Sequence, residues 1–289
     1  MTAAGRALAE VWEKHRVWSA VAEASQRRIV VRRRLNLVLL TVGALMGAVA
    51  AVGGWPSWLT STAAGIAAVV LGAAGLLQAR FLNPGEIGRW SGARAASEAL
   101  KAEVFRHLAG VAPYAGPDRD ERLRERADEV RAVTSGLQVD FQLAVGDGKQ
   151  PPAVCDLSTY VEKRARHQAG WHRGRVGKHQ RLANRLRAAE LGATGVGMVL
   201  AALAAAVRID LAVWVGAAST VAAVFAAHLT ATRHDRIAAT YAATAGQLDD
   251  LVARLPEEPD GATAARFVDA VERVLVAQNE GWVGLLRQG

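Results

Sequence analysis

The stretch Leu35–Trp55, LNLVLLTVGALMGAVAAVGGW, contains no charged residue. After Pro56 and Ser57, the stretch Trp58–Ala79, WLTSTAAGIAAVVLGAAGLLQA, is also free of charge. Each run of about 20 residues is roughly 30 Å long as a helix, which matches the hydrocarbon core of a bilayer. The glycines and the proline between the runs favour a tight turn. The sequence therefore predicts a hairpin of two membrane-spanning helices, about 35–55 and 58–79.

A second pair of charge-free runs follows, LGATGVGMVLAALAAAV from Leu191 to Val207 and LAVWVGAASTVAAVFAA from Leu211 to Ala227. Each has about 17 residues, the lower end of the length that spans a bilayer. We expect a second hairpin with spans at about 191–207 and 211–231. The alternative is an Ala-rich helical hairpin buried in a soluble bundle, but four such runs in one chain favour the membrane.

The basic residues border these runs. Arginines crowd the segment 27–34 before the first run, and Lys163–Arg187 before the third run is almost wholly basic, whereas the hairpin tips carry little positive charge. Cytoplasmic loops of membrane proteins carry an excess of Lys and Arg. We therefore expect a multi-pass protein of the bacterial cytoplasmic membrane, with both termini and the central region in the cytoplasm. The polar first 26 residues do not read as a signal peptide.

Composition excludes several classes of protein. The chain is 51% hydrophobic, which is too apolar for a disordered protein, and its single cysteine, Cys155, excludes a disulfide scaffold. The net charge of +8 would suit a nucleic-acid binder. Because the arginines border apolar spans, anionic lipid headgroups are the simpler partner, and we expect no nucleic acid.

The remaining segments read as helices, and no β pattern of any length appears. Apolar residues at helical spacing indicate helices at 6–26, 86–110 and 262–286. The segment 118–133, dense in both signs of charge, reads as an exposed helix, 157–190 as a long basic helix, and 232–254 as a continuation of the fourth run. We predict an all-α integral membrane protein with two transmembrane hairpins and a cytoplasmic helical bundle. Its two modules would cover residues 1–133 and 157–289, joined by a linker at 134–156.

The sequence contains no catalytic or cofactor signature. A P-loop, GxSxG, HExxH and cysteine-based zinc spacing are all missing from it, so we expect neither an enzyme nor a bound cofactor or metal. His172 and His179 would share a helix face, but two turns separate them by about 10 Å, too far for one metal ion. We expect these histidines to face solvent or headgroups.

Small and hydroxyl residues recur inside the runs. Gly43 and Gly47, and then Ala64, Ala68 and Gly72, have the spacing at which helices pack closely in lipid. Whether they join helices of one chain or of several copies is left open. The hydroxyl residues either line a pore or bond back to their own helix. They are Thr41, Ser61, Thr62, Thr194, Ser219 and Thr220.

A family resemblance rests on motifs that flank both hairpins. After the first hairpin the pattern is Trp90, Arg94, Glu98, Leu100, Lys101 and Tyr114. Around the second hairpin it is Tyr160, Arg164, Gln168, Trp171, Glu272, Asn279 and Trp282. In this order, the motifs resemble those of the SLATT family, the SMODS- and SLOG-associating two-transmembrane effector domains, as two tandem modules.

The resemblance implies a membrane effector of bacterial nucleotide-linked conflict and antiviral defence systems. We expect an oligomer whose spans form a pore, gated through the cytoplasmic helices by a nucleotide-sensing or other cytoplasmic partner. The alternative is a non-conducting membrane scaffold that docks such a partner. The motif residues are expected to be structural. Arg94 and Glu98, four residues apart on one helix face, should pair or contact another helix.

Overall fold

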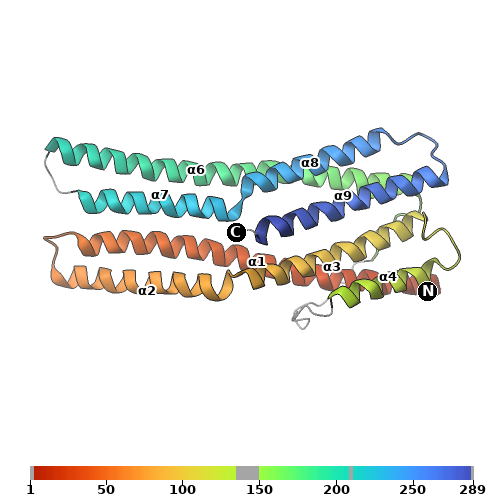
Figure 1. The fold of residues 1–289 in the computed structure, drawn as a ribbon, viewed down its shortest axis with the longest axis horizontal. Helices are drawn as coiled ribbons and strands as arrows, with labels where there is room; N and C mark the ends of the chain where they lie inside the picture. The colour runs from red at the N-terminus through yellow and green to blue at the C-terminus, as the bar shows by residue number, and fades with distance from the viewer. Residues whose placement is uncertain (1–2, 135–149, 208–210, 288–289) are drawn as a thin grey trace. The chain divides into compact units, whose positions relative to one another are not determined.

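The structure is a computed structural model that describes residues 3–134, 150–207 and 211–287. These residues form helices and no strand, which confirms the predicted all-α class. The helices are α1 (Ala3–Ala51), α2 (Ser57–Phe81), α3 (Pro84–Ala109), α4 (Arg119–Thr134), α5 (Leu157–Tyr160), α6 (His167–Val207), α7 (Ala212–Thr232), α8 (His234–Ala253) and α9 (Gly261–Arg287) (Figure 1). A π-helical segment, Val161–Arg166, joins α5 to α6. Most of the predicted linker and the tip 208–210 lie outside the described residues.

Helix ends follow from local residue chemistry. Gly54 takes a φ of +82° in the turn between α1 and α2, a conformation that glycine adopts without a steric penalty. Pro84 opens α3, where its missing N–H costs no hydrogen bond. At α5 the side chain of Asp156 accepts from the Thr159 N–H, and the Thr159 hydroxyl oxygen accepts from the Asp156 N–H, a reciprocal cap.

Four described helical stretches are long and apolar enough to cross a membrane, as the charge-free runs predicted. They are Gly5–Ala51, Ser57–Phe81, Leu157–Val207 and Ala212–Ala253. In the first and third stretches, the spanning run continues a polar helix that precedes it. The sequence indicated neighbouring segments there, and in α1 the boundary at 27–35 contains no Gly or Pro that would interrupt the helix.

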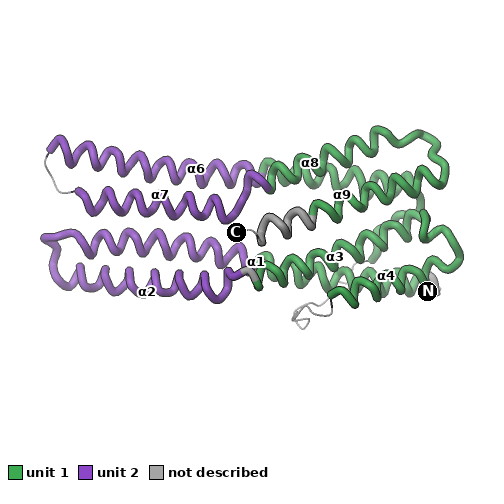
Figure 2. Tube along the Cα trace, in the orientation of Figure 1, with its two compact units in different colours: residues 1–27, 84–177, 237–289 green, residues 28–83, 178–236 purple. Residues whose placement is uncertain are grey.

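The chain divides into two compact units (Figure 2). Unit 1 contains residues 1–27, 84–177 and 237–289, and unit 2 contains residues 28–83 and 178–236. Each unit contains residues from both halves of the chain. The two compact units therefore do not coincide with the two modules predicted along the sequence.

Charge separates sharply between the units. Unit 2 carries twelve Lys and Arg against three Asp and Glu, a net charge of +9. Unit 1 carries 23 against 24, a net charge of −1. The whole positive excess of the chain therefore belongs to the unit that holds the charge-free runs.

Small residues bring the helices of each hairpin together in unit 2. A Cβ placed on Gly43 of α1 would lie 2.5 Å from Leu71 Cδ2 of α2. In the second hairpin, a Cβ on Gly197 would lie 3.4 Å from the Cβ of Ala218. The buried residues of α2 are Ala63, Ala67 and Ala74. Such faces permit the close backbone approach that holds helices together in lipid.

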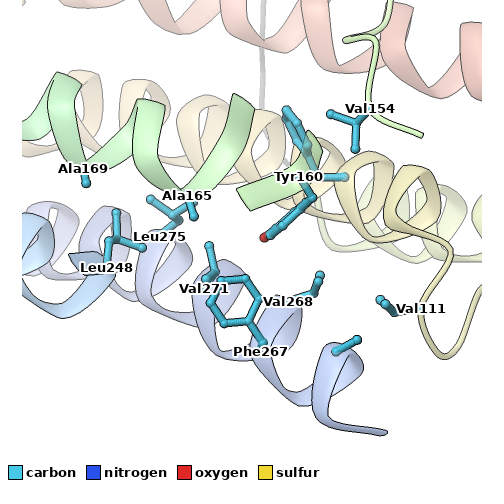
Figure 3. Close-up of a cluster of buried hydrophobic side chains, with 12 residues drawn as sticks. Val111, Val154, Tyr160, Ala165, Ala169, Leu248, Phe267, Val268, Val271 and Leu275 are labelled. Atoms are coloured by element: carbon cyan, nitrogen blue, oxygen red, sulfur yellow. The ribbon is translucent and has the colours of Figure 1, made fainter. Parts of the chain in front are cut away.

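Unit 1 has two apolar clusters. One joins α1, α3 and α4 around Val11, Leu100 and Leu123. The other joins α3, the π-helical segment, α8 and α9, with Tyr160, Leu248 and Val271 fully or almost fully buried (Figure 3). Burial of each large side chain contributes about 1.5–3 kcal/mol, so these clusters supply the main driving force for unit 1.

Two identical substitutions on α1 test the hairpin contact. Gly43→Ala should lower the thermal stability of the protein in detergent, by about 1–3 kcal/mol, because the new methyl group must displace Leu71. Gly47→Ala is the control, since a Cβ there meets nothing within 4 Å. If both variants melt at the same temperature, the described α1–α2 contact is wrong.

Candidate functional site

A buried ion pair lies at the centre of unit 1. Arg164 Nε donates to Glu272 Oε1 at 2.9 Å, and Arg164 Nη2 donates to Glu272 Oε2 at 2.7 Å. The Tyr160 hydroxyl also donates to Glu272 Oε1, at 2.8 Å. Arg164 is 1% exposed, and Glu272 and Tyr160 are fully buried. The bidentate geometry and the third donor satisfy the carboxylate that burial would otherwise leave unsolvated.

Aromatic rings enclose this pair. The Arg164 guanidinium carbon lies 4.3 Å from the centroid of the Phe105 ring, a cation–π contact between the π-helical segment and α3. Tyr160 makes edge-to-face contacts with Phe105 and with Phe267 of α9. Figure 3 shows the Tyr160 hydroxyl directed toward the helix of Val268 and Val271. Three segments from both halves of the chain therefore meet at one arginine.

The surroundings keep Arg164 charged and Tyr160 neutral. Although burial opposes its charge, Glu272 raises the pKa of Arg164. Burial and the Glu272 charge raise the pKa of Tyr160, so the tyrosine stays a neutral donor. Arg164 belongs to a π-helical segment, a form that is rare and recurs at functional sites. We take this polar centre as the candidate functional site.

The predicted motif of α3 lies beside this centre. Arg94 Nη2 is 4.0 Å from Glu98 Oε1, and Lys101 Nζ is 3.9 Å from Glu98 Oε2, and all three side chains are partly buried. Although burial raises it, the positive charges of Lys101, Arg164 and Arg94 lower the pKa of Glu98 overall. Burial and the Arg164 charge lower the pKa of Lys101. The motifs of the two halves thus interact electrostatically.

Further motif residues of the first half are buried. Trp90 and Leu100 are 3% and 2% exposed. The hydroxyl of fully buried Tyr114 donates to Glu103, and Glu103 Oε1 lies 2.7 Å from Arg106 Nη1. Arg106 Nη2 in turn lies 3.0 Å from Asp269 Oδ1, which links α3 to α9 at the surface.

The aromatic cluster of the second half corrects one expectation. His172, expected to face solvent or headgroups, is 2% exposed and packs edge-to-face against Trp171 and Tyr241. Its Nδ1 lies 2.7 Å from the carbonyl oxygen of Gln168, one turn earlier. His172 is buried because it lies, next to Trp171, on the side of α6 that contacts Tyr241 of α8. Residue spacing within α6 alone does not reveal a contact with another helix.

Other motif positions divide between described and undescribed side chains. Gln168 contributes its carbonyl to His172 and is partly buried. Asn279 and Trp282 belong to α9, but their side chains lie outside the described part of the structure. The positions of the described motif residues are consistent with a structural role.

Sequence reasoning missed a buried histidine contact between α1 and α3. His15 Nδ1 lies 2.8 Å from the Ser97 carbonyl oxygen and 3.0 Å from the Ser97 hydroxyl. His15 is 4% exposed, and its ring contacts that of Trp12 in a tilted arrangement, with 4.7 Å between the ring centroids. The apolar stripe that contains Trp12 was the available signal, because His15 follows it by three residues on the same face.

The span residues fall on different faces. Gly43 is buried against Leu71, whereas Ala64, Ala68 and Gly72 of α2 are exposed. Gly47 is partly buried, and its Cβ position is open. The hydroxyls of five candidate pore residues donate to the carbonyl four residues earlier. They are Thr41, Ser61, Thr62, Thr194 and Thr220. Ser219 is exposed.

A surface groove of about 450 Å³ runs between α3, α4 and α9. Its charged lining mixes three arginines with two glutamates, namely Arg106, Arg126, Arg273, Glu103 and Glu129. The pairs Arg106–Glu103 and Arg126–Glu129 neutralise most of this charge. Within the described residues, no three His, Cys, Asp or Glu side chains gather as metal ligands.

The fold and the polar centre define a helical membrane protein with two hairpins and a separate charged unit. Residues 160–282 match the family model described as SMODS and SLOG-associating 2TM effector domain 1, and residues 16–122 match the model of a protein of unknown function, DUF4231. The second half of the chain thus matches the SLATT family, as its motifs predicted, whereas the first half matches a different family model. Searches of curated proteins and of solved structures found no match.

The buried pair is tested by a conservative substitution with a matched control. Glu272→Gln should destabilise unit 1 by about 3 kcal/mol or more, because it leaves the buried Arg164 charge uncompensated. Asp269→Asn on the same helix removes the exposed partner of Arg106 and should cost no more than about 1 kcal/mol. Thermal melts in detergent would refute the central role of the pair if the two variants lost equal stability.

His15 predicts a pH dependence of stability. Burial and the nearby Lys101 charge lower the pKa of His15 from 6.5 to about 4. Between these values the unfolded chain binds more protons than the folded one, so stability falls as pH falls, by about 2 kcal/mol near pH 4.5. His15→Asn retains a donor for the Ser97 carbonyl but cannot titrate. Melting curves from pH 7.5 to 4.5 should therefore be flatter for this variant, and equal slopes would contradict the assignment.

Proposed function

We propose that the protein is an oligomeric membrane effector whose spans form a channel in the bacterial cytoplasmic membrane, as part of a defence or conflict system. The match of residues 160–282 to an effector-domain family supports this role for the second half. The four stretches long enough to cross a membrane support insertion of both hairpins. The proposal assigns the chain no catalytic activity, cofactor or nucleic-acid partner.

Charge supports an orientation with unit 1 and both termini in the cytoplasm. Eleven of the twelve basic residues of unit 2 lie before the first and third runs or after the second and fourth, and the twelfth, Arg208, lies between the third and fourth. These positions lie at the same ends of both hairpins, and positive charge favours the cytoplasmic side. Unit 1, which joins those ends along the chain, is then the cytoplasmic bundle.

The observation that carries assembly is an exposed stripe of small residues on α2. It consists of Ser61, Gly65, Ala68, Gly72, Gly75 and Ala79, all exposed and spaced three or four apart. The stripe lies opposite the buried Ala63, Ala67 and Ala74 that face the same chain. A Cβ on Gly65, Gly72 or Gly75 would meet nothing within 4 Å. In lipid, such a face packs closely against another helix, so we assign it to a second copy.

Helix α7 has a similar exposed face. Gly216, Thr220, Ala223 and Ala227 are exposed, and Ala217 and Ala222 are buried. The contacts within each hairpin use Ala and Gly, so a water-filled path would lie between copies rather than inside one chain. Ser61 and Thr220 lie on these stripes, which places polar groups where copies would meet.

Continuous helices would transmit a change in unit 1 to the spans. Helices α1 and α6 each supply residues to both units. A nucleotide-sensing or other cytoplasmic partner that changes unit 1 would therefore act on helices that continue into the spans. Within unit 1, separation of Arg164 from Glu272 would cost the most stability in such a change, because it would leave buried charges unpaired.

One observation favours a second candidate, a non-conducting membrane scaffold. The hydroxyls of Ser61, Thr62 and Thr220 are already satisfied by their own helices. A helix that satisfies its hydroxyls internally can pack in a dry interface. The scaffold would use the same stripes for assembly and unit 1 for docking, without conduction.

Two identical substitutions on α2 test the proposal. Ala68→Leu adds bulk to the small-residue stripe and should cost about 1–3 kcal/mol of close packing, at least about a fivefold loss in association. Ala73→Leu adds the same bulk to an exposed position outside the stripe and should change little. Oligomer size would be measured by native mass spectrometry, and leakage by a voltage-sensitive dye in cells induced to express each form.

We expect wild type and Ala73→Leu to be oligomeric and to depolarise cells, and Ala68→Leu to lose both properties. An oligomer that leaves the membrane potential unchanged would favour the scaffold. A monomeric wild-type protein would contradict both candidates.

A further inference from the structure

Cationic side chains gather where the two hairpins of unit 2 meet. Arg33 and Arg34 stand at the start of the first charge-free run on α1, and Arg233 stands between α7 and α8. The Arg33 Nη1 donates to the carbonyl oxygen of Ala231 at 3.2 Å, which fixes α1 against the end of α7. Arg233 adopts a left-handed backbone, with φ at +48°, and its charge is close enough to act on Arg33.

Arg33 and Arg34 have little opposing charge within their own unit. Two acidic residues of unit 2 lie in the described part, Glu190 and Asp235, and Asp235 already pairs with Arg187 at 2.5 Å. Within that part, Arg33 and Arg34 form no ion pair with a carboxylate. Burial and the Arg233 charge lower the pKa of Arg33, and Arg33 and Arg34 help to lower the pKa of His234. Each of these groups would gain from a bound anion.

The position of the cluster indicates which kind of anion would bind there. Arg33 and Arg34 immediately precede a run long enough to span the hydrocarbon core, so they fall at the level of the lipid phosphates. Arginine presents a planar fork of donors that matches phosphate oxygens. A phosphodiester with a net negative headgroup, as in phosphatidylglycerol, combines that chemistry with acyl chains that can lie along the exposed apolar helices.

We propose that Arg33, Arg34 and Arg233 form a binding site for the headgroup of an anionic phospholipid, whose phosphate bridges the first and second hairpins. The site is distinct from diffuse attraction of the basic collar, because it uses three residues from two hairpins that already meet at Ala231. It rests on the proposed function only in requiring the hairpins to be inserted in a membrane. Conduction is not needed for it.

The test uses the purified full chain in detergent, titrated with phosphatidylglycerol or phosphatidylcholine and followed by native mass spectrometry. Arg33→Gln with Arg34→Gln should weaken phosphatidylglycerol binding roughly 30-fold, at about fivefold per basic residue near the headgroups. The matched control, Arg181→Gln with Arg185→Gln, removes two exposed charges of the same unit from α6 and should retain most of the binding. Phosphatidylcholine should bind all forms weakly.

Arg34→Gln alone guards against misfolding, since Arg34 is exposed while Arg33 bonds to Ala231. It should weaken binding about fivefold with an unchanged melting temperature. Equal losses in the two double variants would overturn the site and leave only collar attraction. Displacement of the lipid by an equal concentration of glycerol 3-phosphate would also overturn it, in favour of a soluble anion. A failed lipid titration beside intact cell depolarisation would reject this site and keep the proposed function.

Discussion

The ion pair between Arg164 and Glu272 is the interaction on which unit 1 depends. It brings a π-helical segment, α3 and α9 to one point, through hydrogen bonds to the carboxylate and a cation–π contact with Phe105. Both partners are buried, so neither can recover hydration if the other is lost. An apolar replacement of similar volume could be as stable, and for that reason we regard the pair as a device for specificity. It selects which helices meet, because few other side chains could satisfy the guanidinium there.

The separation of charge explains why composition alone was ambiguous. A net charge of +8 with 51% hydrophobic residues fits a nucleic-acid binder and a membrane protein equally poorly. Once residues are sorted by unit, the spans and their borders carry +9 and unit 1 carries −1. The excess of positive charge therefore belongs to the spans and their borders and not to unit 1. Unit 1 instead carries nearly balanced charge.

Much of the fold could be predicted from the sequence, because charge-free runs of spanning length have few alternatives. The helices around them followed from apolar spacing, and the predicted ranges 86–110 and 262–286 lie close to α3 and α9. The composition of the units could not be predicted, since contacts between α3 and α9 link residues far apart in sequence. The burial of His172 could not be predicted for the same reason. Arg173 and Arg175 follow it on α6, and the Tyr241 ring that contacts it comes from α8.

The arrangement of small residues separates two levels of assembly. Gly43 and the buried alanines of α2 join helices within a chain, whereas the stripe through Gly65 and Gly72 stays open. The most direct test of the account is an image of the purified protein in a lipid nanodisc at side-chain resolution. We predict several copies in contact along that stripe of α2, around a continuous aqueous path. A single copy, or copies that meet through other helices, would contradict it.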